Sequence, residues 1–306
     1  MRARPPMLLI ATAAVLIVSV GGCEAKVYGA PGATPPASRV APLVQTIMPP
    51  ESPLGAPDVA FDGLPARIEQ ATNDAAANGA TLSVAVLDRA GNQLITNGND
   101  QLIAIASVAK LFIADDLLSR GSPGAEGTAG LSSEDRRGLD AMLRSSDDGP
   151  AERFWNERGA DTIITGVAGR YGLTSTAPPS DGRWWNTISS ASDLVRYYDT
   201  LLNGSGGLPP GRAEIIINDL AESTATGADG YPQRFGIPDG LYAEPVAVKQ
   251  GWMCCIGSSW MHLSTGVIGS DRRYVMVIES LQPSDDATAR TTITQAVKTM
   301  FPHGQI

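Results

Sequence analysis

The chain has 306 residues with a net charge of −9 at pH 7, 43% hydrophobic residues and 18% charged residues. This composition is typical of a globular protein and excludes a fibrous or wholly disordered chain. The acidic charge also argues against nucleic acid as a partner, because phosphates repel a negative protein surface.

The first 22 residues resemble a bacterial secretion signal. Two arginines precede an uncharged apolar run from Met7 to Val20, which is short for a transmembrane helix. Val20-Gly21-Gly22-Cys23 is similar to a lipobox, which directs lipid to its cysteine and cleavage before it. This resemblance implies removal of residues 1–22 and acylation of Cys23, with ordinary cleavage and a free Cys23 as the alternative.

The mature chain would begin with a tether over residues 23–63. Eight prolines lie among positions 24 to 60, without apolar periodicity, which favours an extended spacer between membrane and domain. With the two signal arginines removed, 21 basic residues face 32 acidic ones, a net charge of −11. Attachment to the lipid bilayer would then depend on the acyl chains, of which stable anchoring needs at least two.

The folded domain is expected over residues 64–306. Helical spacing of apolar residues begins near Leu64 and stops at Gly79. Alternating apolar residues from Leu82 to Val86, followed by a turn and Gln93–Thr96, predict a β-hairpin.

The middle of the domain is predicted to be an all-helical lobe over about residues 107–228. Helical periodicity and capping residues predict helices that begin near Ser107, Ser132, Pro150, Asp161, Ser190 and Arg212. A Gly-rich loop covers Gly121–Gly130, and a longer loop covers Thr174–Asn186. Trp184 and Trp185 in this second loop are interpreted as packing of the lobe, with a ligand platform as the alternative.

Three strands and a closing helix are predicted to complete the domain. The strands cover Pro245–Trp252, Ser258–Ile268 and Tyr274–Glu279, and Ser284 begins the helix. His262 is interpreted as a core or sheet-face histidine. The order of elements predicts an α+β fold with a five-stranded antiparallel sheet, flanked by the N- and C-terminal helices, plus the helical lobe.

Cys254 and Cys255 are expected to be core-filling thiols. Neighbours on a strand point to opposite faces, so a disulfide between them would be strained. Two cysteines are also too few ligands for a cysteine-only metal site.

Ser107 and Lys110 are the candidate nucleophile and base. Residues three apart share a helix face, so the amine can reach the hydroxyl and take its proton. Ser146 would relay protons, and Lys249 would supply a second cation that favours a neutral amine on Lys110. The backbone amides of Ser107 and Trp252 would form the oxyanion hole.

The order and spacing of these residues resemble serine β-lactamases and penicillin-binding proteins. Those families carry S-x-x-K, then S-x-N, then K-T-G or K-S-G. This chain reads Ser107-Val-Ala-Lys110, Ser146-Asp147-Asp148 and Lys249-Gln250-Gly251, and Phe235-Gly236-Ile237-Pro238 also looks like the class A enzymes. The resemblance covers about residues 64–302 and implies a β-lactamase/transpeptidase-like fold without cofactor or metal. It implies substrate contacts at Asp148, Gln250, Gly251 and Trp252.

The chain departs from the family at two motif positions and in one loop. Asp148 replaces an asparagine amide that donates to the substrate, and Gln250 replaces the hydroxyl that binds the substrate carboxylate. The Thr174–Asn186 loop, where class A enzymes keep their deacylating glutamate, has Asp181 as its only carboxylate. These differences argue against efficient β-lactam hydrolysis.

Two functions follow from the resemblance. The first is a serine acyl-enzyme that acts on cell-wall peptides or related acyl donors, on the extracytoplasmic face of a bacterial membrane. The second is a catalytically degenerate lipoprotein of the same fold that binds peptidoglycan peptides or a cell-envelope protein. The composition, rich in alanine and with more arginine than lysine, also resembles the alanine-rich lipoproteins of mycobacteria.

Overall fold

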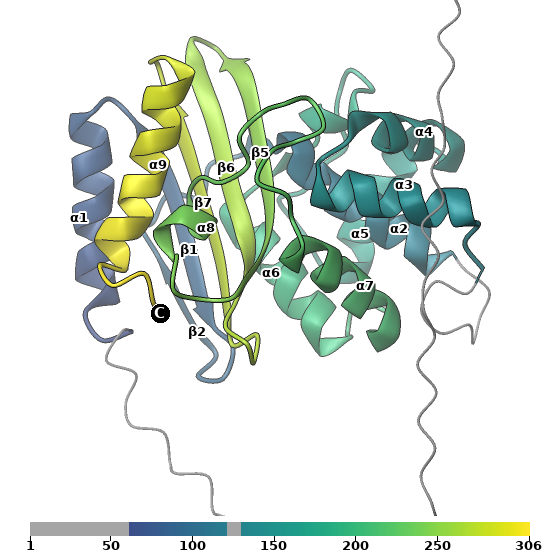
Figure 1. Ribbon diagram of the computed structural model, residues 1–306, viewed down its shortest axis with the longest axis horizontal. Coiled ribbons are helices and arrows are strands. Elements are labelled where there is room, and N and C mark those ends of the chain that lie inside the picture. The colour runs from purple at the N-terminus through teal and green to yellow at the C-terminus, as the bar shows by residue number, and fades with distance from the viewer. Residues whose placement is uncertain (1–60, 121–129) are drawn as a thin grey trace, which may run out of the picture. The chain divides into compact units, whose positions relative to one another are not determined.

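The computed structural model describes residues 61–120 and 130–306 (Figure 1). The predicted signal peptide, the predicted lipidation site Cys23, nearly all of the tether and most of the Gly121–Gly130 loop lie outside the described residues. Among the helices of the described part, none is long and apolar enough to cross a membrane.

A five-stranded antiparallel sheet lies at the centre, with the order β2-β1-β7-β6-β5. Its strands are β1 (Thr81–Asp88), β2 (Gln93–Thr96), β5 (Val246–Ile256), β6 (Ser259–Ile268) and β7 (Tyr274–Gln282). A separate two-stranded sheet joins β3 (Ile103–Ala104) to β4 (Ile188–Ser189). Because β5 is an edge strand, its outer side faces the segment that carries Ser107.

The two terminal helices of the described chain cover one face of the sheet (Figure 1). They are α1 (Leu64–Ala77) and α9 (Asp286–Met300), and the short α8 (Ile237–Gly240) lies beside α9. Their apolar residues, such as Ile68, Ile293 and Val297, form one core cluster with Val84 and Ile278 of the strands. The helix capped by Ser284 in the prediction is instead capped by Asp285, whose carboxylate accepts the Thr288 N–H.

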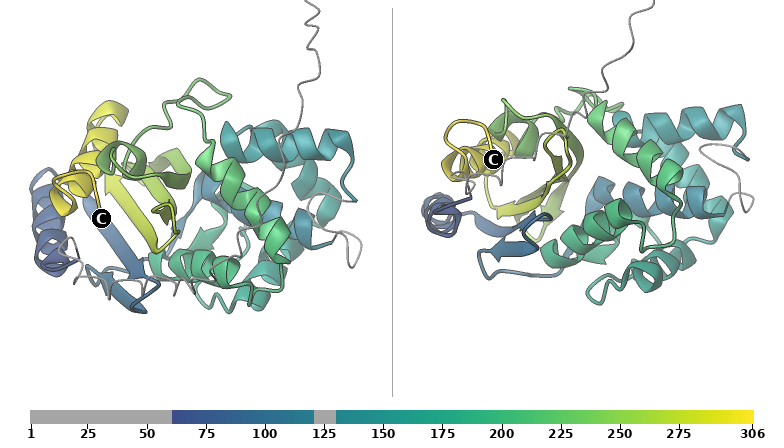
Figure 2. Two further views of the ribbon diagram at one scale, coloured as in Figure 1. Left: turned by 60° about the horizontal axis from the view of Figure 1, so that its bottom comes forward. Right: turned by 90° about the horizontal axis from the view of Figure 1, so that it is seen from below.

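The other face of the sheet packs against the helical lobe (Figure 2). The lobe contains a 3₁₀ turn η1 (Ala106–Ala109), α2 (Lys110–Ser119), α3 (Ser133–Arg144), α4 (Asp148–Arg158), α5 (Asp161–Tyr171), η2 (Trp184–Asn186), α6 (Ala191–Asn203) and α7 (Pro210–Ala221). Ser132 and Ser190 cap α3 and α6 as predicted. The α+β fold, with five antiparallel strands, terminal helices and a helical lobe, is therefore confirmed.

Cys254 and Cys255 form a disulfide with each other, so the prediction of core-filling thiols is wrong. Both residues are exposed, near the tip of the β5–β6 hairpin. The pairing register between these strands shifts from Met253 to Ile256, which ends the regular alternation on which the prediction depended. The interpretation of His262 as a buried sheet residue is confirmed.

Candidate active site

Ser107 lies on a tight backbone turn between β3 and α2. It belongs to η1, and Ala106 before it has a φ of 47°. Ser146, in the short connection between α3 and α4, has a φ of 57°. A left-handed conformation costs an L residue about 1–3 kcal/mol. The surrounding fold must therefore hold Ala106 and Ser146 in this conformation.

Lys110, the first residue of α2, connects the two serines. Its Nζ lies 3.0 Å from Ser107 Oγ, 3.2 Å from Ser146 Oγ and 2.6 Å from the Ser146 carbonyl oxygen. Asp148 Oδ1 accepts from the same amine at 2.5 Å. The lysine side chain is fully buried, so these oxygens replace its lost hydration.

Lys249 reaches the same point from β5. Its Nζ donates to Ser146 Oγ at 2.8 Å and to the Gln250 carbonyl at 3.3 Å. A continuous hydrogen-bonded chain therefore runs from Ser107 through Lys110 and Ser146 to Lys249. The structure brings together all four residues that the sequence indicated for catalysis.

The environment of both lysines lowers the pKa of the amine. Burial lowers the pKa of Lys110, and the Asp148 carboxylate opposes that effect without overcoming it. Burial lowers the pKa of Lys249 well below its ordinary value, and the charge of Lys110 lowers it further. A lysine amine without its extra proton can accept the hydroxyl proton of a serine.

Gly251 allows β5 to approach the turn that carries Ser107. A Cβ atom at this position would lie 2.7 Å from the Ile105 carbonyl oxygen and 3.5 Å from Ala106 Cβ. No larger residue fits there unless the strand and η1 separate. Gly251 therefore sets the spacing between Ser107 and the edge strand.

Gln250 does not face the cleft. The residue is 2% exposed, and its side-chain amide nitrogen donates to the carbonyl oxygens of Gln233 at 3.0 Å and Phe235 at 2.6 Å. Gln250, which was predicted to contact substrate, therefore lies in the interior, on the side of β5 that packs against the segment before α8.

Ser107 opens into a pocket of about 250 Å³. Its walls are Ala106, Asp148, Trp184, Trp185, Asp229, Trp252 and Met253. Sequence reasoning missed Asp229, which lies on a turn before Tyr231 and belongs to no recognisable motif. It is exposed, and its Oδ1 accepts the Tyr231 N–H at 2.9 Å.

Trp184 combines the two roles considered for it. It is buried in the core of the lobe and donates from Nε1 to Glu152 at 3.1 Å, so the packing interpretation is confirmed. Its ring centre also lies 4.8 Å from the Lys110 amine, and the residue lines the pocket.

Asp181 does not take the place of a deacylating carboxylate. Its oxygens accept from the Arg183 N–H and the Asn186 side chain, and the residue is exposed outside the pocket walls. The carboxylate that contacts the Lys110 amine is Asp148 on α4.

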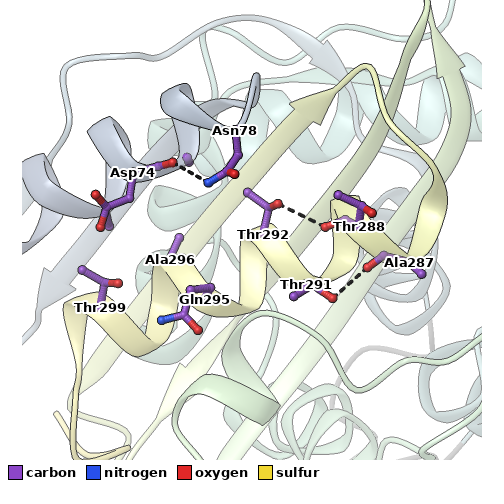
Figure 3. A pocket seen from close by; sticks show the side chains of 11 residues that line it. Asp74, Asn78, Ala287, Thr288, Thr291, Thr292, Gln295, Ala296 and Thr299 are labelled. Carbon is purple, nitrogen blue, oxygen red and sulfur yellow. Dashed lines mark hydrogen bonds between the residues drawn. The ribbon is translucent and has the colours of Figure 1, made fainter.

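A larger groove of about 410 Å³ lies between α1 and α9, on the opposite side of the sheet (Figure 3). Thr291 and Thr292 in its wall donate to carbonyl oxygens of their own helix. Alanine, threonine and amide side chains dominate this groove, and Asp74 is its one ionisable residue. We therefore place the candidate active site at the smaller pocket.

Within residues 61–120 and 130–306, no three His, Cys, Asp or Glu side chains gather as a metal site.

Comparison with known proteins finds relatives over the full chain. A Mycobacterium tuberculosis protein that carries the provisional name lipoprotein LppW is 68% identical over 317 residues. The match covers 100% of both chains. The LppW protein of Mycobacterium bovis gives the same values. No family model matches the chain.

Solved structures show the fold. The TLA-3 extended-spectrum β-lactamase superposes with a TM-score of 0.62 at 13% identity, covering 79% of this chain and 98% of that chain. A β-lactamase from Chitinophaga pinensis gives 0.61 at 14% identity over 78% and 98%. The Streptomyces albus G β-lactamase gives 0.59 at 18% identity over 77% and 98%.

Proposed function

The chain belongs to the LppW lipoprotein family and has a β-lactamase-like fold, and from this premise we propose that it is a membrane-anchored serine acyl-enzyme. Its substrates would be cell-wall peptides or related acyl donors on the extracytoplasmic side of the membrane.

The hydrogen-bonded chain from Ser107 to Lys249 is the observation that carries this proposal. In the proposed reaction, Lys110 takes the Ser107 proton as Oγ attacks the carbonyl carbon of the donor. The amides of Ser107 and Trp252, two residues that line the pocket, stabilise the oxyanion. Ser146 then passes a proton to the leaving group, whose bond to the acyl carbon breaks.

The same site supports slow rather than efficient hydrolysis of the acyl-enzyme. Asp181 lies outside the pocket, and Asp148 is engaged by Lys110. Neither carboxylate lies where a general base could activate a water molecule to attack the acyl-enzyme ester. We therefore expect acyl-enzymes to accumulate.

Membrane attachment is proposed to occur through diacylated Cys23. The lipobox-like sequence and the lipoprotein name of the relatives support this anchor. The residues that follow Cys23 would hold the domain away from the bilayer.

The proposal is tested by intact-mass analysis after incubation with penicillins and with acyl-D-Ala-D-Ala esters. The wild-type protein should gain the mass of one acyl group, and Ser107→Ala should gain none. If no donor adds mass to the wild type, the protein is not an acyl-enzyme.

A second function, a non-catalytic envelope-binding protein, is favoured by the Asp148–Lys110 ion pair. A carboxylate 2.5 Å from the amine stabilises the protonated form that cannot act as a base. In that case the pocket would bind a wall peptide or a protein without bond cleavage, and the same mass measurements would show no adduct.

A further inference from the structure

Three indole rings form the walls of the pocket in front of Ser107. Trp184 and Trp185 meet edge to face with ring centres 5.2 Å apart, and Trp252 faces the pocket from β5. Tyr231 stacks on Trp252 at 4.4 Å with an interplanar angle of 8°. The Tyr231 hydroxyl in turn is hydrogen-bonded to His262 at 2.7 Å, and this bond stabilises the stacked pair of Tyr231 and Trp252.

The indole faces already accommodate cations from the chain. The Lys110 amine lies 4.8 Å from the ring centre of Trp184, and the Arg183 guanidinium lies 5.9 Å from that of Trp185. Aromatic faces attract positive charge because their quadrupole is negative above the ring. The walls therefore suit an ammonium better than an anion.

The charged residues of the pocket walls are acidic. Asp148 and Asp229 both line the pocket, and the Asp148 side chain is 74% exposed. Among the described wall residues there is no lysine, arginine or histidine. Lys110 lies beneath the walls in an ion pair with Asp148. Asp229 has the smallest of the electrostatic effects on Lys110 and Lys249, so these amines offset its charge less than Lys110 offsets that of Asp148.

Two other cations near the pocket contribute little positive charge to it. Arg183, over the Trp185 ring, is exposed to water and has the Asp181 carboxylate 3.9 Å away. Lys249 is buried, and burial lowers its pKa well below the ordinary value. The Gln250 amide, a possible donor to an anionic ligand, is held by two backbone carbonyls in the interior.

We propose that the pocket selects ligands that carry a positively charged alkylammonium group, which lies between the indole faces and Asp229. This inference rests on the proposed function in one respect, which is that the ligand is an acyl donor. Donors with a carboxylate at the corresponding position are rejected, because they meet the negative charge of Asp229, while the Lys110 amine is engaged by Asp148.

Binding can be measured without any acyl transfer, in full-length Ser107→Ala protein in a nonionic detergent. The probes are methyl esters of acetyl-lysyl-, acetyl-norleucyl- and acetyl-glutamyl-D-Ala-D-Ala. Their binding is measured by calorimetry and by tryptophan fluorescence. The lysyl ester should bind about tenfold more tightly than the glutamyl ester, with the norleucyl ester in between. The preference should decrease as salt is raised.

Asp229→Asn in the same background should reduce the lysyl-to-glutamyl preference by about threefold or more. The substitution keeps the oxygen that accepts the Tyr231 N–H, so the turn is retained. Asp74→Asn, on α1, makes the same charge change away from the pocket and should leave the preference unaltered.

An equal or tighter glutamyl complex, no binding of any probe, or an unchanged preference in Asp229→Asn would overturn the inference. Failure of the wild type to form an acyl adduct would instead refute the acyl-enzyme and leave the binding preference intact.

Discussion

Lys110 and Asp148 form an ion pair in which the two charged atoms lie 2.5 Å apart, with the lysine side chain fully buried and the aspartate side chain 74% exposed. Burial lowers the pKa of the amine, while the carboxylate raises it. The balance between burial and the nearby carboxylates, of which Asp148 has the largest effect, therefore sets the pH at which Lys110 can act as a base.

Asp148→Asn should extend the reaction of Ser107 to lower pH. Loss of the carboxylate removes the largest effect that opposes burial, so the pKa of Lys110 falls further and its amine is neutral at a lower pH. The rate of adduct formation at pH 6 should rise severalfold. Intact-mass time courses from pH 5 to pH 9 measure this change.

The pKa of Lys110 can also be followed directly. The chain has only four lysines, so ¹³Cε-lysine NMR can resolve Lys110 and Lys249 by comparison with single Lys→Arg variants. Asp74→Asn should leave both the pH profile and the Lys110 titration unchanged. An Asp148→Asn profile that overlays that of the wild type would show that the ion pair does not control the base.

Gly251→Ala should impair both stability and acylation. The added methyl group would lie 2.7 Å from the Ile105 carbonyl oxygen, so β5 and η1 must separate. We expect a loss of about 1–3 kcal/mol in the free energy of unfolding, together with slower acylation of Ser107. Urea unfolding and mass time courses measure the two effects.

Gly166→Ala provides the matched control. This glycine lies within α5, and a Cβ atom there would meet nothing within 4 Å. Alanine in a helix interior should add about 0.5–1 kcal/mol to stability without a change in acylation. If Gly251→Ala behaved like Gly166→Ala, the close approach of strand and turn would have no functional importance.

Periodicity and motif order were sufficient to predict the fold and the four residues of the hydrogen-bonded chain. The hairpin, the helical lobe and the last three strands each have a strong apolar pattern, and β5 through β7 pair in chain order. Ser107 and Lys110 are close in sequence, so local geometry alone brings them near each other. Ser146 and Lys249 required the motif order as well.

Other features depend on contacts that have no sequence signal. The register shift at the exposed residues Cys254 and Cys255 lies at the end of a strand pair. Gln250 turns inward because backbone carbonyls of the segment before α8 lie within its reach. Asp229 reaches the pocket through a turn whose position depends on the whole domain.

Cys23→Ser should release the protein from the membrane. If Cys23 carries the acyl chains, the substitution removes the hydrophobic anchor, and the acidic chain has no polybasic segment to replace it. Metabolic labelling with an alkyne fatty acid should mark the wild type and not the variant. Equal labelling of the two proteins would contradict the lipobox assignment.

Glu279 on β7 should make the protein less stable as the pH rises. Burial raises the pKa of this carboxyl from its ordinary 4.5 to about 8, and Asp100 adds to the increase, while the Gln101 amide, which donates at 2.7 Å, opposes it. Between these pH values the folded state holds a proton that the unfolded state has released, so the free energy of unfolding falls as pH increases. The loss is complete above about pH 8.

Glu279→Gln removes this titration and keeps an oxygen that can accept from Gln101. The variant should gain stability relative to the wild type by about 3–5 kcal/mol between pH 5 and pH 9. Urea unfolding at each pH measures the difference, and Glu69→Gln, on the exposed side of α1, is the control that should not change it. A constant difference between Glu279→Gln and wild type across this range would mean that the buried carboxyl does not release a proton there.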